Sequence, residues 1–305
     1  MDDRADISDA AREVRGQLIE AGIVIPTAQN YLQYRQDLVD GSADMIAQLE
    51  AGFDGVIEEI ETAGVTCLQL TPAGWSEAAG PVIQYAYGGG YVSGSTGEDQ
   101  GITVPLASAA TARVVMVDYR LSPEHPFPAA QQDMQAVYPA LLDQYGAARL
   151  VVSGESAGGN QTLQLLQHAR DHGLAMPACA IVLSPWIDLT HQGDSHDING
   201  KRDPSLSTAW LDSAATLHAN GHPLDDPGIS PLFGGMRGLP PTMITTGSLD
   251  CLLSDCLRLA RKLRDAGVEC DLRVWEGMWH VFEFYPIPEA RQSIAEMADF
   301  IQSNT

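Results

Sequence analysis

Apolar positions near the N-terminus follow the period of amphipathic helices. One series has alternating spacings of four and three and stops at a glycine: Ile7, Ala11, Val14, Leu18, Ala21 and then Gly22. A second helix is predicted to begin at Ser42 as its N-cap, with Met45, Ile46, Leu49 and Phe53 on one face. We expect no strand between these helices, so residues 1 to about 50 are predicted to be a helical pair attached to the main domain.

From residue 65 onward, short apolar runs alternate with longer helical stretches. The runs that predict strands are Val65–Leu70, Val82–Tyr87, Val114–Tyr119, Leu150–Ser153, Ala180–Leu183, Met243–Thr246 and Leu272–Trp275. The predicted helices are Gln100–Thr111, Ala129–Tyr145, Asn160–His172, Cys251–Ala266 and Pro288–Ser303. Nearly continuous apolar strands separated by helices are typical of an α/β fold with a mostly parallel sheet, covered on both faces. Residues Val268–Trp275 alternate apolar with polar side chains, which predicts a strand nearer the sheet edge.

Residues 187–238 interrupt this alternation. They are rich in Asp, His, Gly and Pro and contain one predicted helix near Thr208–Ala219. The stretch is too long for an ordinary connection, so we interpret it as an inserted piece that joins the N-terminal helices to form a cap. The predicted boundaries are 1–55 and 187–232 for the cap, and 56–186 and 233–305 for the core.

Charge and cysteine content narrow the classes of partner. The net charge of −23, with lysine only at Lys201 and Lys262, argues against nucleic acid and anionic membrane surfaces. Five cysteines without CxxC spacing suggest free thiols in a reducing cytoplasm. The N-terminus is charged from Asp2 onward, so we expect no signal peptide, and no apolar run approaches the ~20 residues that span a bilayer. The oligomeric state is left open between a monomer and a homodimer, for which the predicted edge strand Val268–Trp275 is one candidate interface.

A serine between two glycines marks the candidate reactive centre. Gly154 and Gly158 flank Ser156 at positions −2 and +2, with a predicted strand before the serine and a predicted helix after it. This is the nucleophile-elbow pattern, in which a strained turn projects the serine Oγ away from the sheet. An ordinary glycine-rich turn is the alternative interpretation.

A reactive serine needs a base, and the base needs a carboxylate to orient it. Asp250 and His280 each follow a predicted strand, in the order serine, acid, histidine that this kind of sheet uses. Asp250 could instead cap the following helix, and His280 could be a packing residue. Asp255 is the rival acid and His125 the rival base.

A glycine triplet supplies candidate donors for an oxyanion. Gly88, Gly89 and Gly90 follow a predicted strand, and Ala157 comes directly after the serine. Backbone N–H groups at these positions can converge on one point, as a tetrahedral intermediate requires. A flexible turn is the alternative for the triplet.

Five segments together resemble the bacterial hormone-sensitive-lipase family of α/β-hydrolase esterases: Tyr87–Tyr91, Asp118–Ala129, Gly154–Gly159, Ser184–Thr190 and Glu276–His280. The resemblance covers about residue 60 to the C-terminus. It implies an eight-stranded sheet, a helical cap, no cofactor, and hydrolysis of small carboxylic esters with short to medium acyl chains. Hydrolysis of lactones, carbamates or activated amides by the same residues is left open, as is a non-catalytic ligand-binding role.

Two positions depart from the family pattern. Tyr87 stands where the family usually has a histidine before the glycines, and we expect its phenol to hold the loop by a hydrogen bond. Glu155 replaces the commoner Asp or Thr before the serine.

Aromatic side chains near the predicted strand ends or in the cap are candidates for the substrate pocket, although core packing is an equal alternative for each. They are Tyr87, Tyr91, Trp186, Trp210 and Phe282. Two metal-like patterns, His218 with His222 and the Asp/His residues of 188–197, are discounted, and no metal site is predicted.

Overall fold

The computed structural model describes residues 7–305. The first six residues of the predicted cap, including the charged residues from Asp2 that bear on the signal peptide, lie outside the described part. One sheet holds eight strands: β1 (Gly55–Thr62), β2 (Val65–Pro72), β3 (Val82–Ala86), β4 (Arg113–Val117), β5 (Leu150–Glu155), β6 (Cys179–Leu183), β7 (Thr242–Gly247) and β8 (Cys270–Trp275).

The strand order is β1-β2-β4-β3-β5-β6-β7-β8. Strand β2 is antiparallel to both its neighbours, and all pairs from β4 to β8 are parallel. Every residue of β3, β5, β6 and β7 is buried, as expected for central strands covered on both faces. The α/β fold with a mostly parallel eight-stranded sheet is therefore confirmed.

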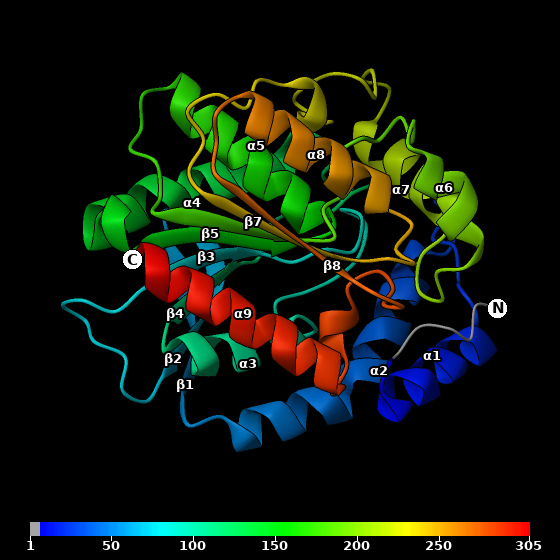
Figure 1. Cartoon of the computed structure of the whole chain (residues 1–305), viewed down its shortest axis with the longest axis horizontal. Helices are drawn as coiled ribbons and strands as arrows, with labels where there is room; N and C mark the ends of the chain where they lie inside the picture. Colours follow the sequence, from blue (N-terminus) through cyan, green and yellow to red (C-terminus); the bar gives the residue numbers. More distant parts are fainter. Residues whose placement is uncertain (1–6) are drawn as a thin grey trace.

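Helices cover both faces of the sheet (Figure 1). On one face lie α4 (Ala129–Tyr145), α5 (Ala157–Asp171) and α8 (Leu253–Asp265), and on the other lie α3 (Gln100–Ala110) and α9 (Pro288–Asn304). The remaining helices, α1 (Asp9–Ala21), α2 (Tyr31–Gly52), α6 (Asp194–Ile198) and α7 (Thr208–Ala219), gather at one end of the sheet. Single-turn 3₁₀ helices occur at Ala147–Arg149 (η1), Asn199–Lys201 (η2), Pro231–Phe233 (η3) and Phe282–Phe284 (η4).

All seven predicted strands are present, and β8 is an edge strand as expected. Strand β1 was missed. Its sequence carries three glutamates, and Val56, Ile57 and Ile60 do not alternate with polar residues. This strand pairs only with β2 and is largely exposed, so the packing that would impose an apolar pattern is absent.

The prediction that Ser42 begins the second helix is wrong. Helix α2 begins at Tyr31, and Ser42 lies in its interior, where its Oγ donates to the carbonyl oxygen of Val39 at 3.1 Å. A serine in mid-helix can bond backward to the backbone in this way, so it does not have to act as a cap.

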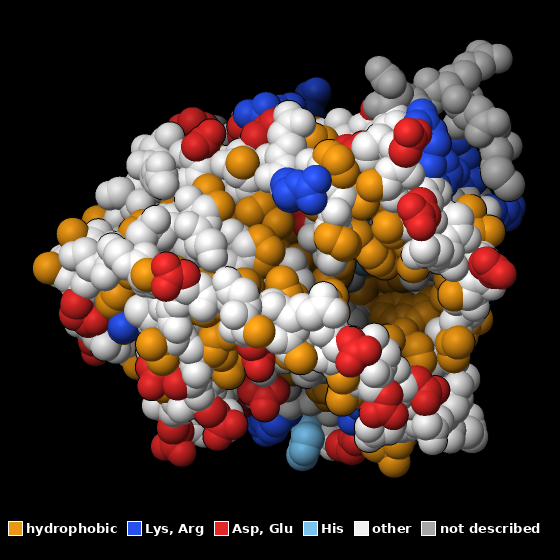
Figure 2. All heavy atoms as spheres, turned by 90° about the horizontal axis from the view of Figure 1, so that it is seen from below, with side chains coloured by type: hydrophobic (Ala, Val, Ile, Leu, Met, Phe, Trp, Pro, Cys, Tyr) orange, Lys and Arg blue, Asp and Glu red, His pale blue; other side chains and the backbone are white. Residues whose placement is uncertain are grey.

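The N-terminal helices and the 187–232 segment contact each other. Trp210 Nε1 of α7 donates to the Tyr34 hydroxyl of α2 at 3.2 Å, and the Ser213 hydroxyl donates to the carbonyl oxygen of Pro26. Seen from the side of α2 and α3, the surface is hollowed, and apolar side chains gather around the hollow (Figure 2). Within residues 7–305, no helix is both long and apolar enough to cross a bilayer.

Candidate active site

Ser156 occupies a strained turn between β5 and α5. Its φ is 52° and its ψ is −116°, a conformation that L-residues rarely adopt. The flanking glycines permit a close backbone approach, because a Cβ on Gly158 would lie 1.9 Å from the carbonyl oxygen of Ala86. A Cβ on Gly154 would likewise lie 2.5 Å from the backbone of Gly158. The elbow therefore requires small residues at both flanking positions.

The structure brings Ser156, His280 and Asp250 together. Ser156 Oγ lies 3.1 Å from His280 Nε2, and His280 Nδ1 lies 3.2 Å from Asp250 Oδ1. Asp250 is fully buried, and its carboxylate also accepts hydrogen bonds from Leu252 N at 2.8 Å and the Thr246 hydroxyl at 2.9 Å. Ser156 follows β5, Asp250 follows β7 and His280 follows β8, so parallel strand ends bring together positions up to 124 residues apart.

The pKa values of the paired groups move in opposite directions. Burial lowers the pKa of the His280 imidazole, but the charge of Asp250, the hydrogen bond to it and the charge of Asp203 outweigh burial and leave the pKa raised. Burial raises the pKa of Asp250, but the charge of His280 and several hydrogen bonds leave it lowered. A protonated His280 imidazole, which lies between the Ser156 hydroxyl and the Asp250 carboxylate, is therefore stabilised. A general base needs this stabilisation after it takes a proton.

The two rivals lie elsewhere. The Asp255 carboxylate is fully buried, accepts from the backbone N–H groups of Ile187 and Asp188, and contacts His196 Nε2 at 3.1 Å. His125 is exposed on the loop before α4.

Asp203 is a buried carboxylate that the sequence did not reveal. Its Oδ2 accepts from His280 N at 3.2 Å and from Cys251 N at 3.0 Å, so it holds both loops that carry the base and the acid. Its Oδ1 accepts from Ser205 N and Leu206 N. Burial and the charge of Asp250 raise the pKa of Asp203 to about 6. Asp203 thus connects the 187–232 segment to the backbone of the two strand-end loops.

Replacing Asp203 with asparagine is expected to lower kcat about tenfold, because an amide NH₂ in place of Oδ2 would face the backbone N–H groups of both Cys251 and His280 and loosen both loops. Removal of its charge also lowers the pKa of His280, so the acid limb of the kcat/KM profile should move to lower pH. Asp225→Asn, an exposed charge change in the same segment, is the control. An unchanged acid limb in Asp203→Asn would contradict this positioning role.

The glycine loop is braced by two stacked tyrosines. The Tyr87 hydroxyl donates to the carbonyl oxygen of Tyr119 at 3.1 Å, and the Tyr119 hydroxyl donates to the carbonyl oxygens of Tyr87 at 2.8 Å and Gly88 at 3.1 Å. Their ring centroids are 4.1 Å apart. Tyr87 thus makes the kind of hydrogen bond expected of it, and its partner is Tyr119.

Glycine is required within the loop by close neighbours. A Cβ on Gly88 would lie 2.0 Å from Glu155 Oε1, and one on Gly90 would lie 2.5 Å from the Trp210 ring. Gly89 lines the same cavity as Ser156. Ala157 is the first residue of α5, where an N–H has no acceptor within the helix. Both positions are therefore available to face a developing oxyanion beside Ser156.

Comparison with known families agrees with this geometry. Residues 83–284, about two thirds of the chain, match a family model described as an α/β-hydrolase fold. The chain belongs to the α/β-hydrolase family.

Similar proteins indicate which branch of the α/β-hydrolase family the chain belongs to. The chain is 35% identical to an esterase of Acinetobacter venetianus over 252 residues, which cover 81% of this chain and 82% of that protein. It is 36% identical to an acetyl-hydrolase of Streptomyces hygroscopicus, with 74% and 77% covered. A crystal structure of an esterase from the bacterial hormone-sensitive-lipase family matches with a TM-score of 0.88 and 33% identity, covering 97% of this chain and 98% of that one. This α/β-hydrolase is therefore a carboxylic ester hydrolase of the hormone-sensitive-lipase branch.

Two adjoining cavities lie beside Ser156 of this hydrolase. The first, of about 160 Å³, we call the serine cavity; Ser156, His280 and Gly89 line it together with Leu206 and Val281. The second, of about 470 Å³, lies between α2 and the glycine loop, and we call it the acidic cavity. Both are lined by six shared residues: Tyr34, Gly89, Glu155, Trp210, Phe284 and Tyr285.

Of the five predicted pocket aromatics, only Trp210 lines these cavities. Tertiary packing buries the other four rings, which is the alternative that the sequence left open for each of them. Tyr87 is buried against the ring of Tyr119, and Phe282 packs beside Trp275 with ring centroids 5.7 Å apart. Tyr91 stacks on His218 at 3.7 Å, and Trp186 Nε1 donates to His191 Nε2 at 3.1 Å.

Sequence reasoning missed the lining residues outside the glycine loop, the serine turn, Trp210 and His280. Tyr34 and Phe284 lie on α2 and η4, and Leu206 lies in the loop before α7. Only Tyr34 gave a usable signal, since it falls on the same face of α2 as Met45 and Leu49, but the late start predicted for this helix concealed it.

The discounted metal patterns have structural partners. Among the residues that the structure describes, no three His, Cys, Asp or Glu side chains gather in a way that suits a metal ion. His218 is buried between Tyr91 and Gln131, and burial lowers its pKa to about 3. Asp188 forms an ion pair with Arg258.

Proposed function

We propose that this esterase hydrolyses carboxylic esters through an acyl-enzyme on Ser156, with His280 as general base and acid and Asp250 as its orienting carboxylate. The observation that carries the proposal is the continuous contact from Asp250 through His280 to the Ser156 hydroxyl, at 3.2 Å and 3.1 Å. Ser156 is only 4% exposed and His280 only 9%, which supports the proposal because the exclusion of water strengthens these interactions.

Acylation begins when Ser156 Oγ attacks the ester carbonyl carbon and its proton passes to His280 Nε2. The carbonyl oxygen becomes an oxyanion, which the N–H groups of Gly89 and Ala157 stabilise, with Gly88 or Gly90 as a further donor. When the intermediate collapses, the ester C–O bond breaks, the alcohol takes the proton from Nε2, and the acyl group remains on Oγ.

Deacylation repeats these steps with water. The water oxygen attacks the acyl carbon while Nε2 takes a proton from it. Collapse of the second intermediate returns that proton to Oγ and releases the carboxylic acid. The charge of Asp250 stabilises the imidazolium that forms in both halves, without itself taking the proton.

The serine cavity sets the expected acyl length. A volume of about 160 Å³ beside Ser156 fits a short acyl or alcohol group, and the acidic cavity leaves room for a longer one. The name of the Streptomyces relative, acetyl-hydrolase, also favours short acyl groups. We therefore expect acetate and butyrate esters to be substrates.

Treatment with a fluorophosphonate probe tests the nucleophile directly. The expected result is one covalent adduct, which peptide mass spectrometry maps to Ser156, with loss of 4-nitrophenyl butyrate hydrolysis in proportion to labelling. An adduct on another residue, or full labelling with activity retained, would refute the assignment.

A further inference from the structure

The acidic cavity holds more carboxyl groups than ester hydrolysis requires. Glu98, Asp99 and Glu155 line it near the glycine loop, and Asp37 lines it from α2. No Lys, Arg or His side chain is among its lining residues. A carboxylate that has no cation beside it normally finds one in a ligand or becomes protonated.

Asp99 is the strongest sign of a missing partner. Its side chain is 2% exposed, it lines the cavity, and its Oδ2 is buried outside hydrogen-bond distance of any donor. The one side-chain donor that acts on its pKa is the neutral Tyr85 hydroxyl, and no cation does. Burial raises the pKa of Glu98, Asp99 and Glu155, and no basic side chain is among the causes that act on the three carboxyl groups. A buried acceptor oxygen left in this state costs free energy that a positively charged donor would recover.

The other walls of the cavity are aromatic and suit the same kind of group. Tyr34, Trp210, Phe284 and Tyr285 face it from three different parts of the chain. Aromatic faces attract cations through their quadrupole, and rings combined with carboxylates are the usual surroundings of bound ammonium groups.

We propose that this esterase selects esters that carry an ammonium group, with the cationic group held in the acidic cavity while the ester carbonyl lies at Ser156. The inference rests on the proposed function of Ser156. Glu155 and Gly89 line both cavities, so a single substrate can extend from one into the other.

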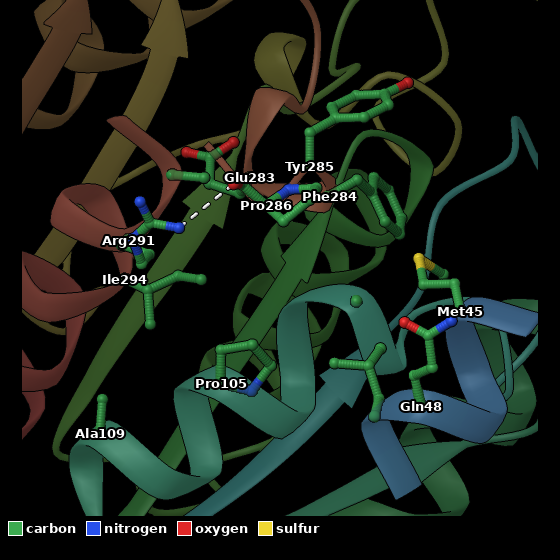
Figure 3. A pocket seen from close by; sticks show the side chains of 13 residues that line it. Met45, Gln48, Pro105, Ala109, Glu283, Phe284, Tyr285, Pro286, Arg291 and Ile294 are labelled. Carbon is green, nitrogen blue, oxygen red and sulfur yellow. Dashed lines mark hydrogen bonds between the residues drawn. The ribbon is translucent and has the colours of Figure 1, made fainter. Parts of the chain in front are cut away.

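A third cavity adjoins the acidic cavity and differs from it in charge. This outer cavity, of about 510 Å³, shares Met45, Phe284, Tyr285 and Pro286 with the acidic cavity. It is also lined by Glu283 and by Arg291, which donates to the carbonyl oxygen of Pro286 at 3.2 Å (Figure 3). Arg291 offsets the single carboxyl group there, so the outer cavity attracts a second cation less than the acidic cavity, which has four carboxyl groups and no basic side chain. The preference is therefore for one compact charge near the ester, and long cationic chains are not expected to be favoured.

Two matched substrate pairs test the proposal on either side of the ester. Butyrylthiocholine is compared with S-(3,3-dimethylbutyl) thiobutyrate, in which carbon replaces the nitrogen. The 4-nitrophenyl ester of 4-(trimethylammonio)butyrate is compared with that of 5,5-dimethylhexanoate. For at least one pair, we expect kcat/KM to favour the cation by about tenfold or more after correction for the hydroxide-catalysed rates.

Variants then assign the preference to the cavity. Asp99→Asn is nearly isosteric, and Glu98→Gln, at a half-buried position, serves if the first variant fails to fold. Each should reduce the cation-to-neutral ratio of kcat/KM about fivefold or more. Asp143→Asn, which makes the same charge change at an exposed position on α4, should leave the ratio unchanged.

The outcomes separate this inference from the proposed function. Hydrolysis of the neutral esters with no cation preference in either pair overturns the ammonium site and leaves the Ser156 mechanism intact. A preference that Asp99→Asn and Glu98→Gln do not reduce also overturns it. Neutral-ester hydrolysis that survives Ser156→Ala would instead refute the proposed function.

Discussion

Replacement of Ser156 by alanine is expected to reduce kcat for 4-nitrophenyl butyrate by about 10⁴-fold or more while the protein stays folded. The Oγ atom is the only group of Ser156 that contacts His280 Nε2, at 3.1 Å, and alanine removes it without adding an atom. Without a nucleophile, only oxyanion stabilisation and binding remain, and these support a small residual rate. Stopped assays of kcat, with circular dichroism to verify folding, measure the effect.

Strand β5 offers a matched control for this loss. Ser153 lies three residues earlier, is fully buried, and has an Oγ without a hydrogen-bond partner. Ser153→Ala should therefore keep kcat within about twofold, because it deletes a hydroxyl that has no interaction to lose. Residual activity above about one percent in Ser156→Ala, beyond what a wild-type contaminant explains, would contradict the nucleophile assignment.

The core of the fold could be predicted because its burial is uniform. Central strands such as β5 and β6 are covered on both faces, so every position except Glu155 at the end of β5 is apolar or small, and the run is visible in the sequence. Strand β1 has one neighbour and solvent around it, and nothing forces its residues into a pattern. Helix α2 has no fully buried residue, so the weak periodicity before Ser42 was passed over.

The three central site residues could be predicted for a topological reason. Parallel strands all end at one edge, so Ser156, Asp250 and His280 were expected to meet once each was seen to follow a strand. Asp203 could not be found in this way, since it lies in a segment without regular strands and acts on backbone N–H groups. Every residue except proline has a backbone N–H group, so the residue type does not reveal which of these groups a carboxylate will bind.

The pocket walls were the least predictable part. An aromatic residue near a strand end can line the substrate pocket or pack into the core, and the sequence does not distinguish these two outcomes. Tyr91 and Trp186 each stack on a histidine ring and do not line the cavities. Trp210 lies on a cap helix, and its ring lies next to Gly90. Which ring faces the cavity depends on how the cap sits on the sheet, and that arrangement is set by contacts such as Trp210 with Tyr34.

Replacement of Asp250 by asparagine is expected to reduce kcat by about 10³-fold and to move the acid limb of the pH profile. The amide oxygen can still accept from Leu252 N and contact His280 Nδ1, so the loop should keep its shape. The charge is lost, and with it the main opposition to burial at His280, so the pKa of the imidazole falls. Because the neutral imidazole is the active base, a lower pKa extends the plateau of kcat/KM to lower pH, at a much reduced height.

Asp255 supplies the matched control, since it is equally buried, lies five residues further on, and pairs with His196 instead of His280. Asp255→Asn should lower the free energy of unfolding, because its carboxylate accepts two backbone N–H groups, but kcat of the folded protein should fall less than about threefold. The two variants therefore separate charge beside the base from charge in the core. If Asp255→Asn were the more damaging to kcat, or if the acid limb stayed in place in Asp250→Asn, the assignment of Asp250 as the partner of His280 would be wrong.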